Sequence, residues 1–278
     1  DRGNRMNFLK PVEEDAKDSL TLLITNMSGA IGAAIIGDPT GMAAAVIPRI
    51  INEVIHRIIF PLTSPSESKR LYQWGKQTAG GIAQRVNNGE EFRKDGFFEE
   101  TPTNRSNFEE VVESTLKKVA VQVIDTTEEP KVKFMRYLTE NFHFDEDLDM
   151  ATYRQILKDL EDLSYRQLCI IRLISLGHQK VGIDPINEIE QVPQNKQTRF
   201  YSIGRDFENL MDNHYIISAS IPRYSEIGDP FLRSPGSGSL PDSTKRLDRF
   251  VNLNQIPDAD IEKTFSLWKV KIKKEGEP

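Results

Sequence analysis

Hydrophobic and small residues dominate one stretch near the start of the chain, Ser19–Pro48, which contains a single charged residue, Asp38. Two apolar runs flank the turn Gly37–Gly41. Within that turn, Pro39 fixes its own φ and disfavours the α region for Asp38, while the glycines at both ends tolerate positive φ. The pattern therefore predicts a helix–turn–helix hairpin.

Small residues recur every fourth position along the first arm of this hairpin, at Gly29, Ala33 and Gly37. That spacing places them on one helix face, where a second helix can approach closely. We interpret these three residues, with Asp38 and Pro39 of the turn, as candidate contacts for core packing, a partner or a membrane.

The run Ser19–Gly37 has 19 residues, which is just long enough to cross a bilayer. Asn26 and Pro48 interrupt the apolar pattern, and the sequence after Pro48 becomes amphipathic. We therefore expect a buried hairpin at the heart of a soluble helical bundle. Membrane insertion stays open as a conditional second state.

Helical periodicity continues through the middle of the chain. The segment Leu168–Leu176 is apolar on almost every side, which predicts a central helix that buries Cys169. Ser164 and Gln167 have the spacing of a capping box at its start, and Gly177 should end it. The helices expected along the rest of the chain cover residues 66–86, 107–125, 131–142, 149–163 and 200–213.

The C-terminal part has a different pattern. Residues 227–244 are rich in Gly, Pro and Ser, which indicates a loop. Residues 268–273 alternate apolar and lysine side chains, which predicts an edge strand that pairs with residues 215–220. The predicted fold is mainly α, a multi-helix bundle around an apolar helical hairpin with a small β element near the C-terminus.

These patterns divide the chain into three regions. The expected division is an apolar helical hairpin region at 1–62, a helical bundle ending in a winged-helix-like module at 63–222, and a loop-rich tail with one edge strand at 223–278.

The net charge of −6 disfavours sequence-independent binding to nucleic acid, which needs a basic surface. Cys169 is the only cysteine, so an intramolecular disulfide and a cysteine-cluster zinc site are excluded, and a reducing compartment is expected. The polar first residues do not have the pattern of a secretory signal. We expect a cytoplasmic protein, with membrane association left open. Whether Asp1 is the native terminus is also open.

The acidic run Asp145–Asp149 begins like a calcium loop, with alternating aspartates. Met150 stands where such a loop needs glycine, and Ile156 stands where it needs glutamate. An acidic helix start is the favoured interpretation, because negative charge stabilises the N-terminal end of a helix.

A helix, a loop, a second helix and a short strand follow one another from residue 164 to 220, which is the order of a winged-helix module. Lys196, Arg199 and Arg205 are the candidate nucleic-acid contacts of that module. Carboxylates of the same predicted helix would repel a phosphate backbone, so nucleic-acid binding is disfavoured. They are Asp206, Glu208 and Asp212.

Motifs for phosphate loops, dinucleotide binding and zinc proteases are absent from the sequence. We therefore assign no catalytic, cofactor-binding or metal-binding residue, and an enzyme is the less favoured class. A hydrolase whose site is assembled from distant carboxylates and histidines remains an alternative.

The segments FMRYLTENFHFDED, TYRQILKDLEDLSYRQLCIIRLI and FYSIGRDFENLMDNHYII lie in order within residues 131–217. This block resembles part of the bacterial abortive-infection alpha family, some members of which are linked to phage defence. The resemblance implies a bacterial, cytoplasmic, mainly helical protein, and it carries over no catalytic motif.

Together, these observations predict a non-enzymatic bacterial interaction or effector protein organised around a buried apolar hairpin, with a protein partner of unknown identity. The resemblance alone implies a role in phage defence. The alternatives are a winged-helix DNA-binding regulator and a hydrolase. A homo-oligomer is compatible with the sequence.

Overall fold

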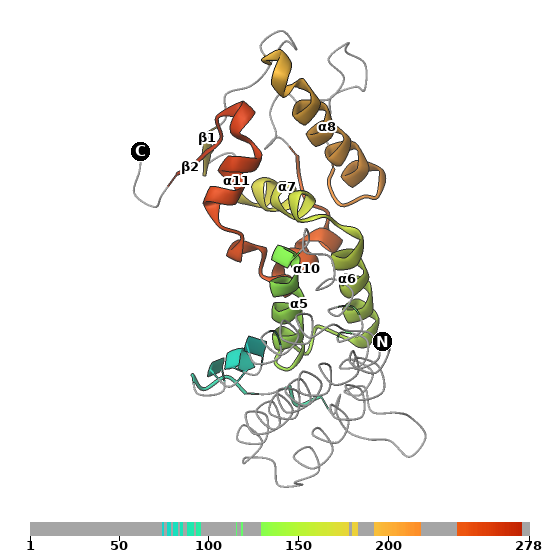
Figure 1. Cartoon of the computed structure of the whole chain (residues 1–278). Helices are drawn as coiled ribbons and strands as arrows, with labels where there is room; N and C mark the ends of the chain where they lie inside the picture. Colours follow the sequence, from blue (N-terminus) through green and yellow to red (C-terminus); the bar gives the residue numbers. More distant parts are fainter. Residues whose placement is uncertain are drawn as a thin grey trace, which may run out of the picture. The chain divides into compact units, whose positions relative to one another are not determined.

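A computed structural model describes residues 129–177, 180–182, 192–217 and 238–273, with isolated positions and short runs between 74 and 118 (Figure 1). The chain divides into two compact units, Asp1–Asp162 and Leu163–Pro278. Helices dominate both, and the described residues contain one sheet of two short strands. The predicted mainly α fold class is therefore confirmed. The predicted hairpin lies outside the described residues.

In the first unit, α5 (Glu129–Phe142) packs against α6 (Met150–Asp162). Both helices carry apolar residues three or four positions apart, so each presents one apolar stripe to the other. The rings of Phe142 and Tyr153 meet with their centroids 4.7 Å apart. The fully buried side chains of this pair are Phe134, Met135, Leu138, Phe142, Tyr153 and Leu160.

The connection between α5 and α6 is the acidic run. Oδ1 of Asp149 accepts a hydrogen bond from the backbone N–H of Thr152 at 2.7 Å, which caps the start of α6. Oδ1 of Asp145 accepts one from the N–H of Asp147 at 3.0 Å, and Leu148 is buried between these acidic residues. The interpretation as an acidic helix start is confirmed.

In the second unit, α7 (Tyr165–Leu176) is the central helix. Its predicted capping box is present: Ser164 Oγ accepts from the N–H of Gln167, and Gln167 Oε1 accepts from the N–H of Ser164. Gly177 ends the helix at φ 71°, a conformation that glycine adopts without strain. Cys169 is fully buried, as expected.

Three helices pack on α7 (Figure 1). Aromatic side chains fill the space between α8 (Gln197–Asp212) and η7 (Ser266–Trp268), where Phe200 stacks on Trp268 with ring centroids 5.6 Å apart. The further elements of this unit are β1 (Val181–Gly182), η5 (Gln194–Lys196), α8 (Gln197–Asp212), α10 (Asp242–Val251), η6 (Leu253–Gln255), α11 (Asp258–Thr264), η7 (Ser266–Trp268) and β2 (Lys271–Ile272).

The strand pairing differs from the prediction. β2 pairs antiparallel with β1, with Val181 opposite Ile272, whereas Ile217 forms an isolated bridge with Ser239. The predicted alternation along the C-terminal segment is nevertheless present, because Val270 is buried while Lys271 is exposed.

The expectation of a loop-rich tail at 223–278 is corrected in its described part, which contains α10 and α11. Leu247, Phe250 and Val251 recur at helical spacing and are buried, so the segment gains stability from packing. The preceding Gly-, Pro- and Ser-rich composition masked that signal. The predicted boundaries at 62 and 222 fall outside the described residues and stay predictions.

Candidate functional site

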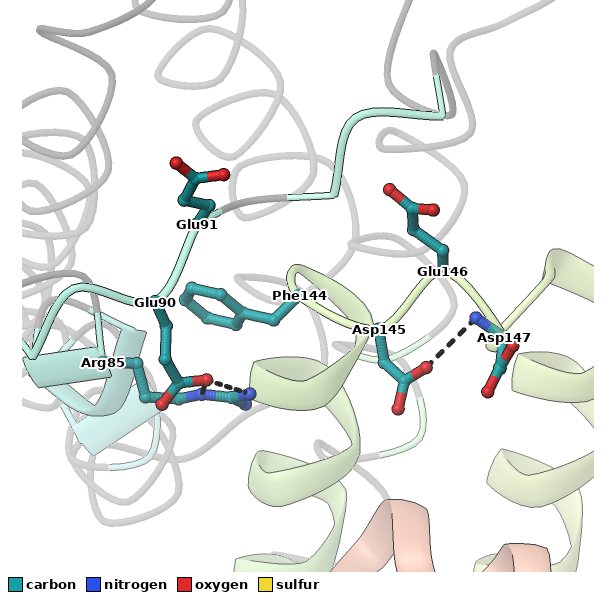
Figure 2. A pocket seen from close by; sticks show the side chains of 7 residues that line it. All are labelled: Arg85, Glu90, Glu91, Phe144, Asp145, Glu146 and Asp147. Atoms are coloured by element: carbon teal, nitrogen blue, oxygen red, sulfur yellow. Dashed lines mark hydrogen bonds and ion pairs between the residues drawn. The ribbon is translucent and has the colours of Figure 1, made fainter.

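The first unit holds a groove of about 440 Å³ beside the α5–α6 connection. One wall comes from the end of the helical segment at residue 85 and the chain after it, and the other comes from the turn that follows α5 (Figure 2). The lining residues are Arg85, Glu90, Glu91, Phe144, Asp145, Glu146 and Asp147. We call this the acidic groove.

Arg93 holds the two walls together. Its side chain is 1% exposed, and its Nη1 donates to the carbonyl oxygens of Leu148 at 2.9 Å and Phe142 at 3.3 Å. Its backbone N–H donates to the carbonyl oxygen of His143 at 3.0 Å. Asp95 balances the guanidinium charge in a two-point ion pair. Such a charge-assisted network fixes the geometry of the turn between α5 and α6.

Arg85 forms the base of the acidic groove. Its Nη1 donates to Oδ1 of Asn141 at 2.7 Å, and its Nε donates to Glu90 at 2.8 Å. The central carbon of the Arg85 guanidinium lies 4.0 Å from the centre of the Phe144 ring. A cation over an aromatic face is a favourable contact, so the site already contains one example of the pairing that it could offer to another cation.

The charge balance of the acidic groove is strongly negative, with five carboxylates and one guanidinium in its lining. Glu146 and Asp147 are exposed, so their carboxylates face solvent. The neighbouring Lys94 ammonium lowers the pKa of the Glu91 carboxyl by hydrogen bonding and by its charge. A surface of this kind attracts cations and repels phosphate.

Two buried titratable side chains lie at the end of α5, Glu140 in its last turn and His143 immediately after it. Glu140 is 7% exposed, and burial raises the pKa of its carboxyl to about 7 although Arg136 and Arg85 oppose the shift. Burial likewise lowers the pKa of His143 to about 4. The Nδ1 atom of His143 lies 2.7 Å from the carbonyl oxygen of Thr139, a contact that favours the tautomer with its proton on Nδ1. Shifted groups of this kind often accompany functional sites.

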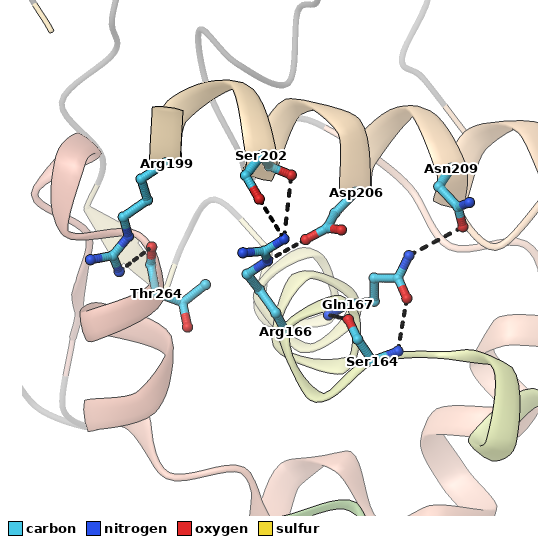
Figure 3. A network of polar contacts seen from close by, with 8 residues as sticks. All are labelled: Ser164, Arg166, Gln167, Arg199, Ser202, Asp206, Asn209 and Thr264. Atoms are coloured by element: carbon cyan, nitrogen blue, oxygen red, sulfur yellow. Dashed lines mark hydrogen bonds and ion pairs between the residues drawn. The ribbon is translucent and has the colours of Figure 1, made fainter. Parts of the chain in front are cut away.

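The second unit contains a polar network between α7 and α8 (Figure 3). Arg166 pairs with Asp206 and donates to Oγ of Ser202 at 2.8 Å. Gln167 donates to Oδ1 of Asn209 at 3.1 Å. These side chains satisfy one another, so we interpret the network as a device that fixes the packing of α8 on α7.

The candidate nucleic-acid residues do not form one surface. Lys196 ends η5, and Arg199 and Arg205 lie on α8 about 120° apart around the helix axis, counted at 100° per residue. Arg199 donates to the carbonyl oxygens of Lys263 and Thr264 at the end of α11, the latter at 3.2 Å (Figure 3). The Arg199 guanidinium therefore holds the start of α8 to the end of α11.

The other candidate contacts, Gly29, Ala33, Gly37, Asp38 and Pro39, lie outside the described residues. The sequence pattern does not predict the acidic groove. The runs Glu90–Glu91 and Asp145–Asp147 are both visible in the sequence, but more than 50 positions separate them. Only the fold brings them to one place.

Within the described residues, no cluster of three or more His, Cys, Asp or Glu side chains is arranged to hold a metal ion. Among the helices that the structure describes, none has the length and apolar character needed to cross a membrane.

No family model matches the chain, and neither the curated proteins nor the solved structures include a match to it.

Proposed function

We propose that the protein is a non-enzymatic interaction protein that holds a cationic segment of a protein partner in its acidic groove. The observation that carries this proposal is the groove itself: five carboxylates around the Phe144 ring, in a volume of about 440 Å³. The groove is shallow and open to solvent, so it suits a side chain of a partner protein rather than an enclosed small molecule. A lysine or arginine side chain has both the charge and the length to enter.

An arginine is the preferred side chain. Its planar guanidinium can pair with two carboxylate oxygens at once and can stack on an aromatic ring. Arg85 already makes both kinds of contact, with Glu90 and with Phe144. An arginine supplied by a partner would repeat this pattern with the exposed carboxylates of Glu91, Glu146 and Asp147.

Hydrogen bonds hold the two walls of the acidic groove in place, which favours specific binding rather than general attraction of cations. The N–H of Lys94 donates to Oε1 of Glu146 at 3.0 Å, and Arg93 ties the same segment to the α5–α6 turn. A site whose carboxylates are already positioned loses less entropy when the partner arrives.

Several broader expectations stay within this proposal. A bacterial effector in phage defence rests on the resemblance of residues 131–217, and a cytoplasmic location rests on the cysteine content. Release of the apolar hairpin to a membrane concerns residues that the structure does not describe. Leakage of dye from anionic liposomes would support the release of the hairpin, and retention of the dye would contradict it.

The direct test uses isothermal titration of the full chain with a short peptide of alternating glycine and arginine residues. The control peptide replaces each arginine by citrulline, which has the same shape without the charge. We expect saturable binding of the arginine peptide that weakens as salt rises, and no binding of the citrulline peptide.

Variants locate the binding. Glu91→Gln with Asp147→Asn should weaken binding at least about tenfold, because two of the carboxylates are lost. The matched control, Glu208→Gln with Asp212→Asn, makes the same change of charge at exposed positions on α8. Equal weakening by both double variants would reduce the effect to overall charge and would overturn the proposal.

A further inference from the structure

The second pocket lies in the other unit and has the opposite charge. It measures about 220 Å³ and lies between α7 and the face of α10 that continues into η6. Its lining residues are Arg172, Lys245, Asp248, Arg249, Asn252 and Asn254. Three cations thus meet one carboxylate on a chain whose net charge is −6.

The spacing along α10 explains why these side chains converge. Lys245, Asp248, Arg249 and Asn252 are three or four positions apart, so they share one face of the helix. Asn252 ends α10 in the left-handed conformation at φ 54°, and the chain then turns into η6, which contributes Asn254. We call this the basic pocket.

Arg172 is the most enclosed cation of the basic pocket. Its Nη1 donates to Oγ of Ser175 at 3.1 Å. Its Nε is buried and has no hydrogen-bond acceptor within the described part of the chain. Because this Nε atom has no surface open to the pocket, Arg172 contributes its positive charge to the pocket rather than an Nε–H donor.

The single carboxylate of the pocket is Asp248. Burial raises the pKa of Asp248, against the lowering effects of the Arg172 charge and of a hydrogen bond with Ser175. Lys245 pairs with Asp242 at 3.0 Å, but both side chains are mostly exposed, so this contact is weak and easily exchanged. Arg249 lies beside the Phe250 ring at 4.9 Å.

We propose that the basic pocket binds the phosphate group of a small phosphate monoester. Arg172, Lys245 and Arg249 outnumber the lining carboxylate Asp248 and the neighbouring carboxylate Asp242, so the local charge is positive and favours an anion. The exposed cations at the rim, Lys245 and Arg249, and the two asparagine amides supply donors of the kinds that phosphate oxygens accept, and Arg172 adds its charge. The pocket is smaller than the roughly 300–1,000 Å³ typical of drug-sized ligands, so it suits the phosphate end of a small molecule.

The test follows the arginine Nε–H signals of the ¹⁵N-labelled full chain by NMR, with inorganic phosphate and then ribose 5-phosphate as probes. Chloride at matched ionic strength serves as the control salt. We expect one buried arginine signal, assigned to Arg172 by its loss in Arg172→Lys, to move saturably with either phosphate and not with chloride. Absence of a saturable shift with phosphate would overturn the proposal.

Rim variants keep the test decisive if Arg172→Lys fails to fold. Lys245→Gln with Arg249→Gln should weaken phosphate binding at least about tenfold. Arg246→Gln is the control, since Arg246 is exposed on the same helix and does not line the pocket. Equal affinity in the rim double variant and in Arg246→Gln would overturn the proposal, as would binding of inorganic phosphate with exclusion of ribose 5-phosphate.

Discussion

The last turns of α5 and the body of α7 bury different kinds of side chain. From Gln167 to Ile174, α7 buries almost exclusively apolar groups, and its polar ends are satisfied by the capping box and by α8. The end of α5 instead buries Glu140 and, immediately after it, His143 beside the turn that Arg93 holds.

This difference shows where each unit gains and loses stability. Apolar burial stabilises the second unit by roughly 25 cal/mol for each Å² removed from water. Burial of an ionisable group costs free energy unless the group gives up its charge, and the shifted pKa values of Glu140 and His143 record that cost. The body of α7 therefore contributes mainly apolar burial, whereas the end of α5 retains costly ionisable groups next to the acidic groove.

The largest expected effect comes from the apolar region. Phe265→Ala should lower the free energy of unfolding by about 3–5 kcal/mol, because a fully buried ring in contact with Phe207 and Trp268 is replaced by a cavity. Urea unfolding followed by Trp268 fluorescence in a Trp74→Phe background measures it, since each unit has one of the two tryptophans. Tyr201→Ala, at a site 58% exposed, is the control and should cost under about 1 kcal/mol.

The second prediction concerns pH and the two buried titratable groups. The pKa of Glu140 is raised in the folded state, so the unfolded chain loses this proton first and stability falls as pH rises from about 4.5 to about 7. The pKa of His143 is lowered, so stability falls as pH drops from about 6.5 to about 4. The two slopes oppose each other and nearly cancel between pH 4.5 and 6.5.

Single variants separate these slopes. Relative to the parent, Glu140→Gln should become more stabilising as pH rises, and His143→Gln more destabilising, each by up to about 3 kcal/mol. Unfolding at pH 4.5, 5.5, 6.5 and 7.5, followed by Trp74 fluorescence in a Trp268→Phe background, gives both curves. Parallel curves for the two variants and the parent would contradict the assignment of shifted pKa values.

The smallest effect comes from two neighbouring glycines in the helical segment before the acidic groove. A Cβ atom on Gly81 would lie 2.2 Å from Oε1 of Glu140, whereas one on Gly80 would meet nothing within 4 Å. Gly81→Ala should therefore destabilise the protein by about 1–3 kcal/mol, while Gly80→Ala should stabilise it by up to about 1 kcal/mol. The same Trp74 fluorescence assay compares them, and equal effects would show that the Glu140 carboxyl does not rest on Gly81.

The sequence by itself determined the features whose partners are close along the chain. Ser164 and Gln167 are three positions apart, so their reciprocal hydrogen bonds follow from local helix geometry, and Gly177 ends α7 for a similarly local reason. The apolar character of Leu168–Leu176 also predicted its central place, because such a helix must be covered on all sides.

Only the tertiary structure decided the features whose partners are distant. β1 pairs with a strand about 90 positions later, where the sequence favoured a nearer partner. The acidic groove joins Glu90 to Glu146, and the basic pocket joins Arg172 to Arg249. In both pockets the chemistry depends on charged side chains from segments that are distant along the chain. Hydrophobic periodicity shows which face of a helix is covered, but it does not show which other helix covers it.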